Sequence, residues 1–229
     1  MSCGPSFPLP FGAVTGGILY YDGGDINVRL ANGASQTRTA QQDMAALMGV
    51  SLPLAYGLSA GATAKIFRLE LAQEVRTTGY AGDVGAIWRT PLRGLNLGVS
   101  LQNLGPAVKF EQEADPLPMT VRLGAAYEFN LGDLDWFKEG GFGFSKFLVT
   151  GDAVKLRDEG LVPSTGMEMV MALGEQNSAA LRFGYIFSQQ STSLTLGVGV
   201  RQGRWLLDYG LGAMKTLANT HHFSLGVKF

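Results

Sequence analysis

Three features of the sequence predict an all-β fold, an antiparallel transmembrane β-barrel with about twelve strands. The last nine residues, 221–229, alternate between apolar side chains on one side and polar or small ones on the other, as in a strand with two unlike faces. Comparable alternating segments, separated by turn signals, recur along the chain. Charged residues make up only 16% of the sequence, against about 25% in typical soluble domains. Together these features favour strands that each present one face to lipid.

The apolar face of the last strand carries a second signal. A strand that ends a soluble chain on an apolar edge promotes aggregation, whereas a barrel pairs its last strand with its first. The apolar side chains also resemble the C-terminal signal by which barrel assembly machinery recognises its clients. The residues concerned are Phe223, Leu225, Val227 and Phe229.

Six strands are expected in the N-terminal half. Glycine and β-branched residues favour a first strand over residues 11–21, which ends at a turn signal. Residues 26–30 either continue this hairpin or lie in a loop, and the polar residues 31–42 predict a long loop. Alternation of apolar with small or polar residues predicts the other five strands. They span residues 44–52, 58–71, 82–90, 95–102 with a continuation over 107–110, and 120–130.

Six more strands are expected in the C-terminal half, from the same alternation. They span residues 147–155, 167–173, 179–187, 194–201, 205–214 and 221–229. The preceding residues 131–145 are irregular, because aromatic side chains are interleaved there with glycine and charge. The total is even, as expected for a bacterial barrel.

The connections alternate in length, which predicts long extracellular loops and short periplasmic turns. The long connections are residues 31–42, 73–79, 111–118, 157–165, 188–193 and 215–220. The short connections are residues 53–57, 91–94, 174–177 and 202–203. Residues 131–145 break this pattern, as a long connection at the end of the short turns.

Charged residues fall on the polar faces of the strands, with the two signs nearly in balance. In contact with lipid, an Arg or Lys would cost about 2–4 kcal/mol at the middle of the membrane, so we expect these residues to face the lumen. Ion pairs that fill the lumen are the favoured interpretation, and a substrate path is the alternative. The residues are Lys65, Asp83, Arg89, Arg122, Glu128, Asp152, Glu168, Arg182 and Asp208.

Two further features concern strand ends. Asn103 and Gly105 interrupt the fifth strand, which predicts a bend or bulge near the extracellular rim rather than a ligand site. Aromatic residues near strand ends predict girdles at the membrane interfaces. They include Tyr20, Trp88, Tyr127, Phe129, Phe187, Trp205, Phe223 and Phe229.

No catalytic constellation is evident, so we do not expect an enzyme. His221 and His222 are adjacent and on a strand would point to opposite faces, which disfavours a shared metal. Ser224 would lie about 7 Å from His222, too far for a hydrogen bond. No cofactor or metal is therefore expected. The net charge of −1 gives no reason to expect nucleic acid as a partner, and the single Cys3 excludes an internal disulfide.

The first residues lack the basic region and apolar core of a signal peptide. A barrel of the bacterial outer membrane must be exported, so we expect this sequence to lack the N-terminus of a longer parent. Residues 1–229 are expected to form one outer-membrane barrel domain in contact with membrane lipid.

Several motifs resemble the PorV/PorQ-type outer-membrane proteins, a group related to the FadL-type channels for long-chain fatty acids. The stretch G-L-N-L-G-V-S-L-Q-N-L-G-P-A-V-K-F at residues 94–110 and D-P-L-P-M-T-V-R-L-G-A-A-Y at 115–127 are similar to the middle of these proteins. So are A-G-D-V-G-A-I-W-R-T-P at 81–91, L-R-F-G-Y at 181–185, L-D-Y-G at 207–210 and the last nine residues. The resemblance implies a fourteen-stranded barrel, of which one N-terminal hairpin, the lumen plug and the signal peptide are absent here.

The resemblance implies two alternative functions. A PorV-like protein would be an accessory of type IX protein secretion, which binds the C-terminal domains of cargo, contacts other secretion-system subunits and shuttles cargo at the cell surface. A FadL-like protein would be a channel for long-chain fatty acids or other hydrophobic small molecules. A channel needs an apolar lining near the extracellular mouth, whereas a shuttle places its binding surface on the extracellular loops. We expect the PorV-like role.

Overall fold

The computed structural model describes residues 2–29, 33, 35–71, 75–110, 113–130, 144–174, 176–187, 194–213 and 219–228. These residues form two compact units. The first contains residues 1–88, 99–121 and 156–158, and the second contains residues 89–98, 122–155 and 159–229. No helix in the described part of the chain has the length and apolar character needed to cross a membrane.

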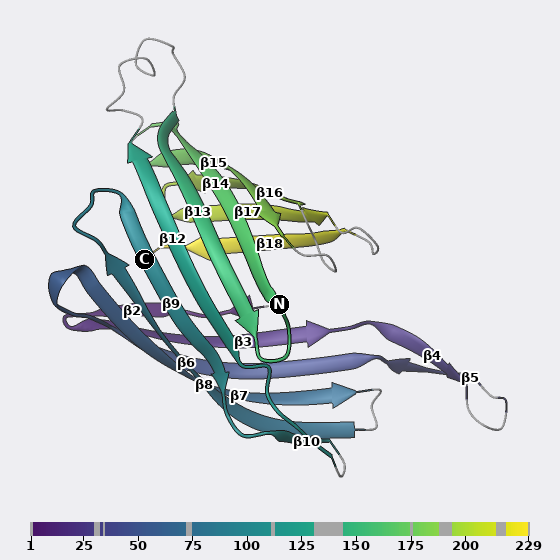
Figure 1. Ribbon diagram of the computed structural model, residues 1–229. Coiled ribbons are helices and arrows are strands. Elements are labelled where there is room, and N and C mark those ends of the chain that lie inside the picture. The colour runs from purple at the N-terminus through teal and green to yellow at the C-terminus, as the bar shows by residue number, and fades with distance from the viewer. Residues whose placement is uncertain are drawn as a thin grey trace. The chain divides into compact units, whose positions relative to one another are not determined.

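The described residues are almost entirely β-strand, and the principal sheet has fourteen strands (Figure 1). Two short strands, β1 (Ser2–Cys3) and β2 (Ser6–Leu9), both pair with β3. The others follow one another in chain order, as in an antiparallel meander. They are β3 (Gly12–Asp22), β6 (Gln41–Pro53), β7 (Leu58–Leu71), β8 (Val75–Arg89), β9 (Leu95–Leu104), β12 (Thr120–Asn130), β13 (Phe144–Leu156), β14 (Leu161–Ala172), β15 (Asn177–Ile186), β16 (Leu194–Gln202), β17 (Trp205–Ala213) and β18 (Thr220–Val227). The prediction of about twelve alternating antiparallel strands is confirmed.

The observed strand boundaries agree best with the predicted ones where apolar and polar residues alternate strongly. β7 and β12 span the predicted residues 58–71 and 120–130. The short turns at residues 53–57 and 91–94 also occur where they were predicted, the first as a single 3₁₀ turn, Ala55–Gly57. The turn after β16 has Gly203 at a φ of 57°, a left-handed conformation that glycine adopts without strain.

Four stretches predicted as loops contain strands, and these predictions were wrong in part. The reason is that strands beyond the lipid-facing zone carry polar residues on both faces and lack the alternation that marks the others. Within residues 31–42, β5 (Ser35–Thr39) pairs with β4 (Asp25–Arg29). Within residues 111–118, β11 (Glu113–Asp115) pairs with β10 (Val108–Phe110), which therefore does not continue β9. β8 begins at Val75 and β14 at Leu161.

Some predictions fall on residues outside the described part of the chain. These are most of the irregular stretch 131–145, the loop 188–193, most of the loop 215–220, and Phe229 of the C-terminal signal. The other three residues of that signal lie on β18, and the side chains of Phe223 and Leu225 are strongly exposed.

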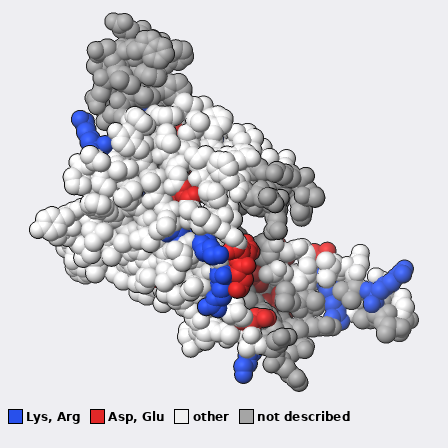
Figure 2. All heavy atoms as spheres, viewed as in Figure 1, with Lys and Arg blue, Asp and Glu red and all other residues white. Residues whose placement is uncertain are grey.

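One face of the sheet is apolar and uncovered in both units. In the first unit Met48 is 66% exposed and Ile66 57%, and in the second Phe223 is 78% exposed. Only four apolar residues are buried in the described part of the chain, namely Ala81, Val108, Leu117 and Ala180. Figure 2 shows a surface on which charged side chains gather in a few places. A β-sandwich would bury such a face against a second sheet, whereas a membrane barrel presents it to lipid.

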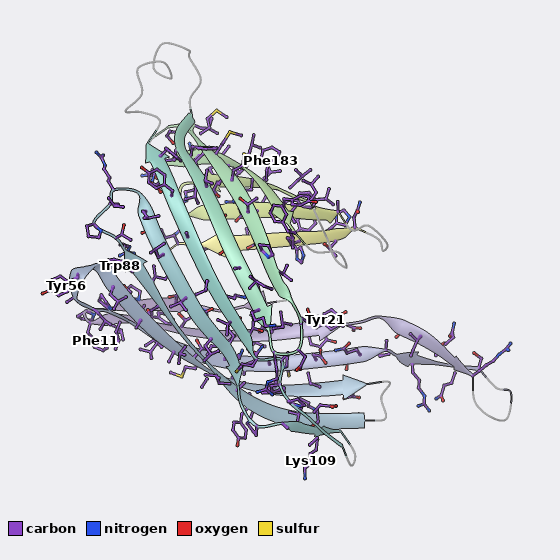
Figure 3. The ribbon with its side chains drawn as sticks, in the orientation of Figure 1. Phe11, Tyr21, Tyr56, Trp88, Lys109 and Phe183 are labelled. Atoms are coloured by element: carbon purple, nitrogen blue, oxygen red, sulfur yellow. The ribbon has the colours of Figure 1, made fainter. Side chains whose placement is uncertain are left out.

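Aromatic residues gather at the short-turn end of the first unit. Figure 3 shows Phe11, Tyr56 and Trp88 at this end, contributed by the β2–β3 turn, the β6–β7 turn and the end of β8. The indole Nε1 of Trp88 donates a hydrogen bond to the carbonyl of Tyr56 at 3.2 Å. Such amphipathic aromatic groups suit the boundary between hydrocarbon and water.

Candidate functional site

The polar face of the first unit holds an ion pair at its centre. The register between β7 and β8 pairs Thr63 with Asp83 and Lys65 with Ala81, so Lys65 and Asp83 are diagonal neighbours on one face. Lys65 Nζ lies 2.7 Å from Asp83 Oδ1, and the two side chains are only 18% and 24% exposed. The two predicted lumen residues therefore neutralise each other.

Asn103 completes this group, which we call the Lys65 cluster (Lys65, Asp83 and Asn103). Its Oδ1 accepts a hydrogen bond from Lys65 Nζ at 2.7 Å, and its backbone N–H donates to Asp83 Oδ1 at 2.9 Å. Asn103 has a φ of 60°, in the left-handed region that is uncommon for residues other than glycine. Its Nδ2 donates to the carbonyl of Pro118 at 3.0 Å. The residue predicted to mark a bend thus joins the end of β9 to the charged face.

A second cluster lies on the corresponding face of the second unit. Arg182 on β15 donates from Nε to Glu168 Oε2 on β14 and from Nη1 to Asp208 Oδ1 on β17, both at 2.5 Å. β16 runs between β15 and β17, so the arginine reaches across a strand. We call these three residues the Arg182 cluster.

Glycines on β16 make this reach possible. Gly197 lies opposite Arg182, and Gly199 lies opposite Asp208. A Cβ at Gly199 would lie 2.5 Å from Asp208 Oδ1 and 2.9 Å from Arg182 Nη1, closer than van der Waals contact allows. The small residues therefore leave the space that the guanidinium group occupies.

A third ion pair in the second unit joins Glu128 on β12 to Lys146 on β13, with Nζ and Oε1 3.2 Å apart. Lys146 was not among the predicted residues, because its strand begins inside a stretch that appeared irregular in sequence. In the register with β14, Leu148 lies opposite Glu168, and Lys146 lies two residues before Leu148, so Lys146 and Glu168 share a face. The repeat of two residues along the strand was the sequence signal that could have identified Lys146.

The three remaining predicted lumen residues form no ion pair within the described part of the chain. Arg89 is the last residue of β8, and Arg122 on β12 is exposed. Asp152 on β13 lies over Gly124, whose Cβ would be 2.5 Å from Asp152 Oδ1. No group of three or more His, Cys, Asp or Glu side chains suited to a metal ion occurs among the described residues.

The polar face of the first unit also carries an apolar cluster, which sequence reasoning missed. Val108 of β10 and Leu117 pack with Ala81 of β8, each about 7% exposed or less, and Phe67 of β7 packs against them. Phe67 lies two residues after Lys65 on β7, and Ala81 lies two residues before Asp83 on β8. The cluster therefore lies on the charged face, toward the loop end. The only sequence signal was the presence of Val108 and Leu117 around an acidic stretch.

The two histidines lie on β18. Tyr209 Oη and His221 Nδ1 are 2.8 Å apart, and Tyr209 also packs against Phe223, with ring centroids separated by 4.9 Å. These aromatic residues belong to the apolar face, since Tyr209 pairs with Phe223 and with Val198.

Comparisons with known proteins identify the fold. No family model and no curated protein sequence matches the chain. Among solved structures, the toluene transporter TodX of Pseudomonas putida superposes with a TM-score of 0.59, over 98% of this chain and 79% of TodX, at 11% sequence identity. The likeness supports the fold class indicated by the strands, an antiparallel transmembrane β-barrel.

The barrel fold determines what each face of the sheet contacts. In such a barrel the uncovered apolar face meets lipid and the charged face lines the lumen. The Lys65 cluster, the Arg182 cluster and the apolar cluster would then all be lumen features. None of the comparisons points to PorV or PorQ proteins, so that part of the sequence-based resemblance stays a prediction.

Proposed function

We propose that this protein is an outer-membrane barrel that passes apolar small molecules through its lumen. The observation that carries the proposal is the apolar cluster of Phe67, Ala81, Val108 and Leu117 on the face that otherwise bears charge. It lies toward the loop end, where a channel for hydrophobic molecules needs an apolar lining. The FadL-like fold, shared with a toluene transporter, supports the same class of solute.

The Lys65 cluster and the Arg182 cluster each favour an uncharged solute. Lys65 Nζ contacts both Asp83 and Asn103, each at 2.7 Å, and Arg182 contacts both Glu168 and Asp208. A side chain that is already ion-paired binds a charged solute weakly, because the new contact would leave its present partner unsatisfied. An uncharged aromatic hydrocarbon is therefore the favoured cargo, and a fatty acid would be recognised through its apolar chain alone.

Uptake into cells tests this proposal. The full chain, preceded by an export signal, would be expressed in a Gram-negative host that lacks its own fatty-acid channel. Labelled toluene and labelled long-chain fatty acid would be supplied, with a maltodextrin as the polar control. We expect faster uptake of at least one apolar solute than in the vector control, without faster uptake of the sugar. Equal uptake of the sugar, or no gain for either apolar solute, would contradict the proposal.

Location is tested separately. We expect the protein in the outer-membrane fraction of the host cells, because an apolar outer face is stable only in contact with lipid. Recovery in the soluble fraction would contradict the assignment of the apolar face to lipid.

A further inference from the structure

We propose that a short strap inside the lumen gates the path for apolar solutes and lifts when one passes. The strap consists of β10 (Val108–Phe110), β11 (Glu113–Asp115) and Leu117. This inference rests on the proposed function, since it assigns a gate to that pathway. Its basis is that the strap is seated on the lumen face by side-chain packing, not by the hydrogen bonds of the barrel wall.

The strap covers the loop end of β7 and β8 on their charged face. Val108 and Leu117 are each 7% exposed, and they pack with Ala81 and Phe67. Val108 also crosses Gly79 closely, since a Cβ at Gly79 would lie 2.6 Å from Val108 Cγ1. Gly79, Ala81 and Asp83 alternate along one side of β8, so the strap and the Lys65 cluster occupy neighbouring positions on the same face.

The strap is structurally separate from the wall. β10 and β11 form their own two-stranded sheet, with three residue pairs from Val108–Asp115 to Phe110–Glu113. Among the described residues, neither strand belongs to the principal sheet. Lifting the strap therefore exposes a small apolar contact but breaks no hydrogen bond of the barrel ladder.

Both ends of the strap are held at one place. Asn103, in its left-handed conformation, ends β9 and donates from Nδ2 to the carbonyl of Pro118, which follows Leu117. A Cβ at Gly105 would lie 2.4 Å from the carbonyl oxygen of Tyr80 and 2.8 Å from Leu117 Cδ1. The chain thus enters and leaves the strap beside the Lys65 cluster, which acts as a fixed base about which the strap can move.

An apolar solute is the natural trigger for this movement. In the seated state Phe67 and Ala81 are covered by Val108 and Leu117. A solute that contacts Phe67 and Ala81 replaces those contacts with its own, so it binds the lifted state better than the seated one. A sugar cannot replace apolar contacts in this way. The strap would thereby admit hydrophobic molecules and keep the path closed to polar ones.

A disulfide that locks the strap tests the gate. We choose Gly79→Cys with Val108→Cys, because the two Cβ atoms would lie about 4 Å apart or less, within the usual span of a disulfide. The background carries Cys3→Ser, to remove the native thiol, and Phe67→Leu, because Phe67 Cζ would lie 2.5 Å from the new Cβ. The background protein and the two single-cysteine variants are the controls.

The readout is uptake of a labelled apolar solute by cells of the same Gram-negative host that carry the protein, after treatment with an oxidant or a reductant. We expect about tenfold slower uptake by the oxidised pair, full recovery on reduction, and no redox effect in the controls. Unchanged uptake after complete crosslinking overturns the gate. Failure of the pair to crosslink contradicts the seating of the strap and also overturns it. If the protein without any substitution takes up no apolar solute, the proposed function is refuted instead.

A loosened strap gives the opposite test. Leu117→Asn places a polar amide in the apolar cluster, so we expect faster uptake and a leak of small sugars. Lys109→Gln is the matched control, because Lys109 lies on the strap but its side chain is exposed (Figure 3). Equal uptake by Leu117→Asn, Lys109→Gln and the unchanged protein contradicts the gate.

Discussion

Arg182 and Asp208 form an ion pair across an intervening strand, with Nη1 and Oδ1 2.5 Å apart. β16 separates their strands, and its Gly199 lies directly opposite Asp208. The pair therefore exists only because a residue without a side chain sits beneath it. Charge and glycine position are coupled in this part of the lumen face.

Substitution of Gly199 should break that coupling. In Gly199→Ala the new Cβ would lie 2.5 Å from Asp208 Oδ1, so the carboxylate or the guanidinium group must move. We expect a loss of about 1–3 kcal/mol in the free energy of unfolding, measured by urea titration in detergent micelles. Gly151→Ala is the control, because no atom lies within 4 Å of the Cβ position at Gly151. Equal stability of the two variants would contradict the steric argument.

Removal of Arg182 alone should cost more than removal of the whole cluster. Arg182→Met leaves Glu168 and Asp208 without their cation, and we expect a loss of about 1–3 kcal/mol, because the arginine side chain is 40% exposed. The triple variant that adds Glu168→Gln and Asp208→Asn should recover most of this loss, since no charge is then unpaired. Chemical denaturation of both variants measures the difference. A triple variant less stable than Arg182→Met would show that pairing is not what the cluster contributes.

Asn103 contributes both a backbone conformation and side-chain hydrogen bonds, and two substitutions separate them. Asn103→Gly retains easy access to a φ of 60° but loses the bonds to Lys65 and Pro118. Asn103→Ala loses both, and the left-handed conformation costs about 1–2 kcal/mol for an ordinary residue. We therefore expect Asn103→Ala to be the less stable of the two by about 1 kcal/mol in urea unfolding. The reverse order would mean that the backbone conformation carries no strain.

Trp88 should report the membrane boundary. It lies on the apolar face at the short-turn end, and its Nε1 donates to the carbonyl of Tyr56. In a protein whose other tryptophans are replaced by Trp136→Phe and Trp205→Phe, we expect the Trp88 fluorescence to be quenched by lipids brominated near the headgroup. Lipids brominated near the chain ends should quench it less. Stronger quenching by the deep label would place Trp88 at the middle of the bilayer and contradict the girdle.

The sequence predicted strands best where side chains alternate between lipid and lumen. Met44 to Leu52 and Thr120 to Asn130 show this pattern, and both segments are strands. Alternation is a local property, since successive side chains of a strand point to opposite faces whatever the partner strand is. The faces that carry Lys65, Asp83, Glu168 and Arg182 could therefore be assigned without a structure. The polar hairpins β4–β5 and β10–β11 could not, because neither has one apolar face.

Pairing within the lumen was decided by tertiary structure. Alternation in the sequence places Arg182 on the same face as several acidic residues. The register of four strands determines that its partners are Glu168 and Asp208. Asn103 is a plausible bend residue in sequence, and only the fold brings it to Lys65. The seating of Val108 on Gly79 likewise joins residues 29 positions apart along the chain. A repeat of two residues determines which way a side chain points, whereas the residue it meets depends on strand register and on chain reversals, which are non-local.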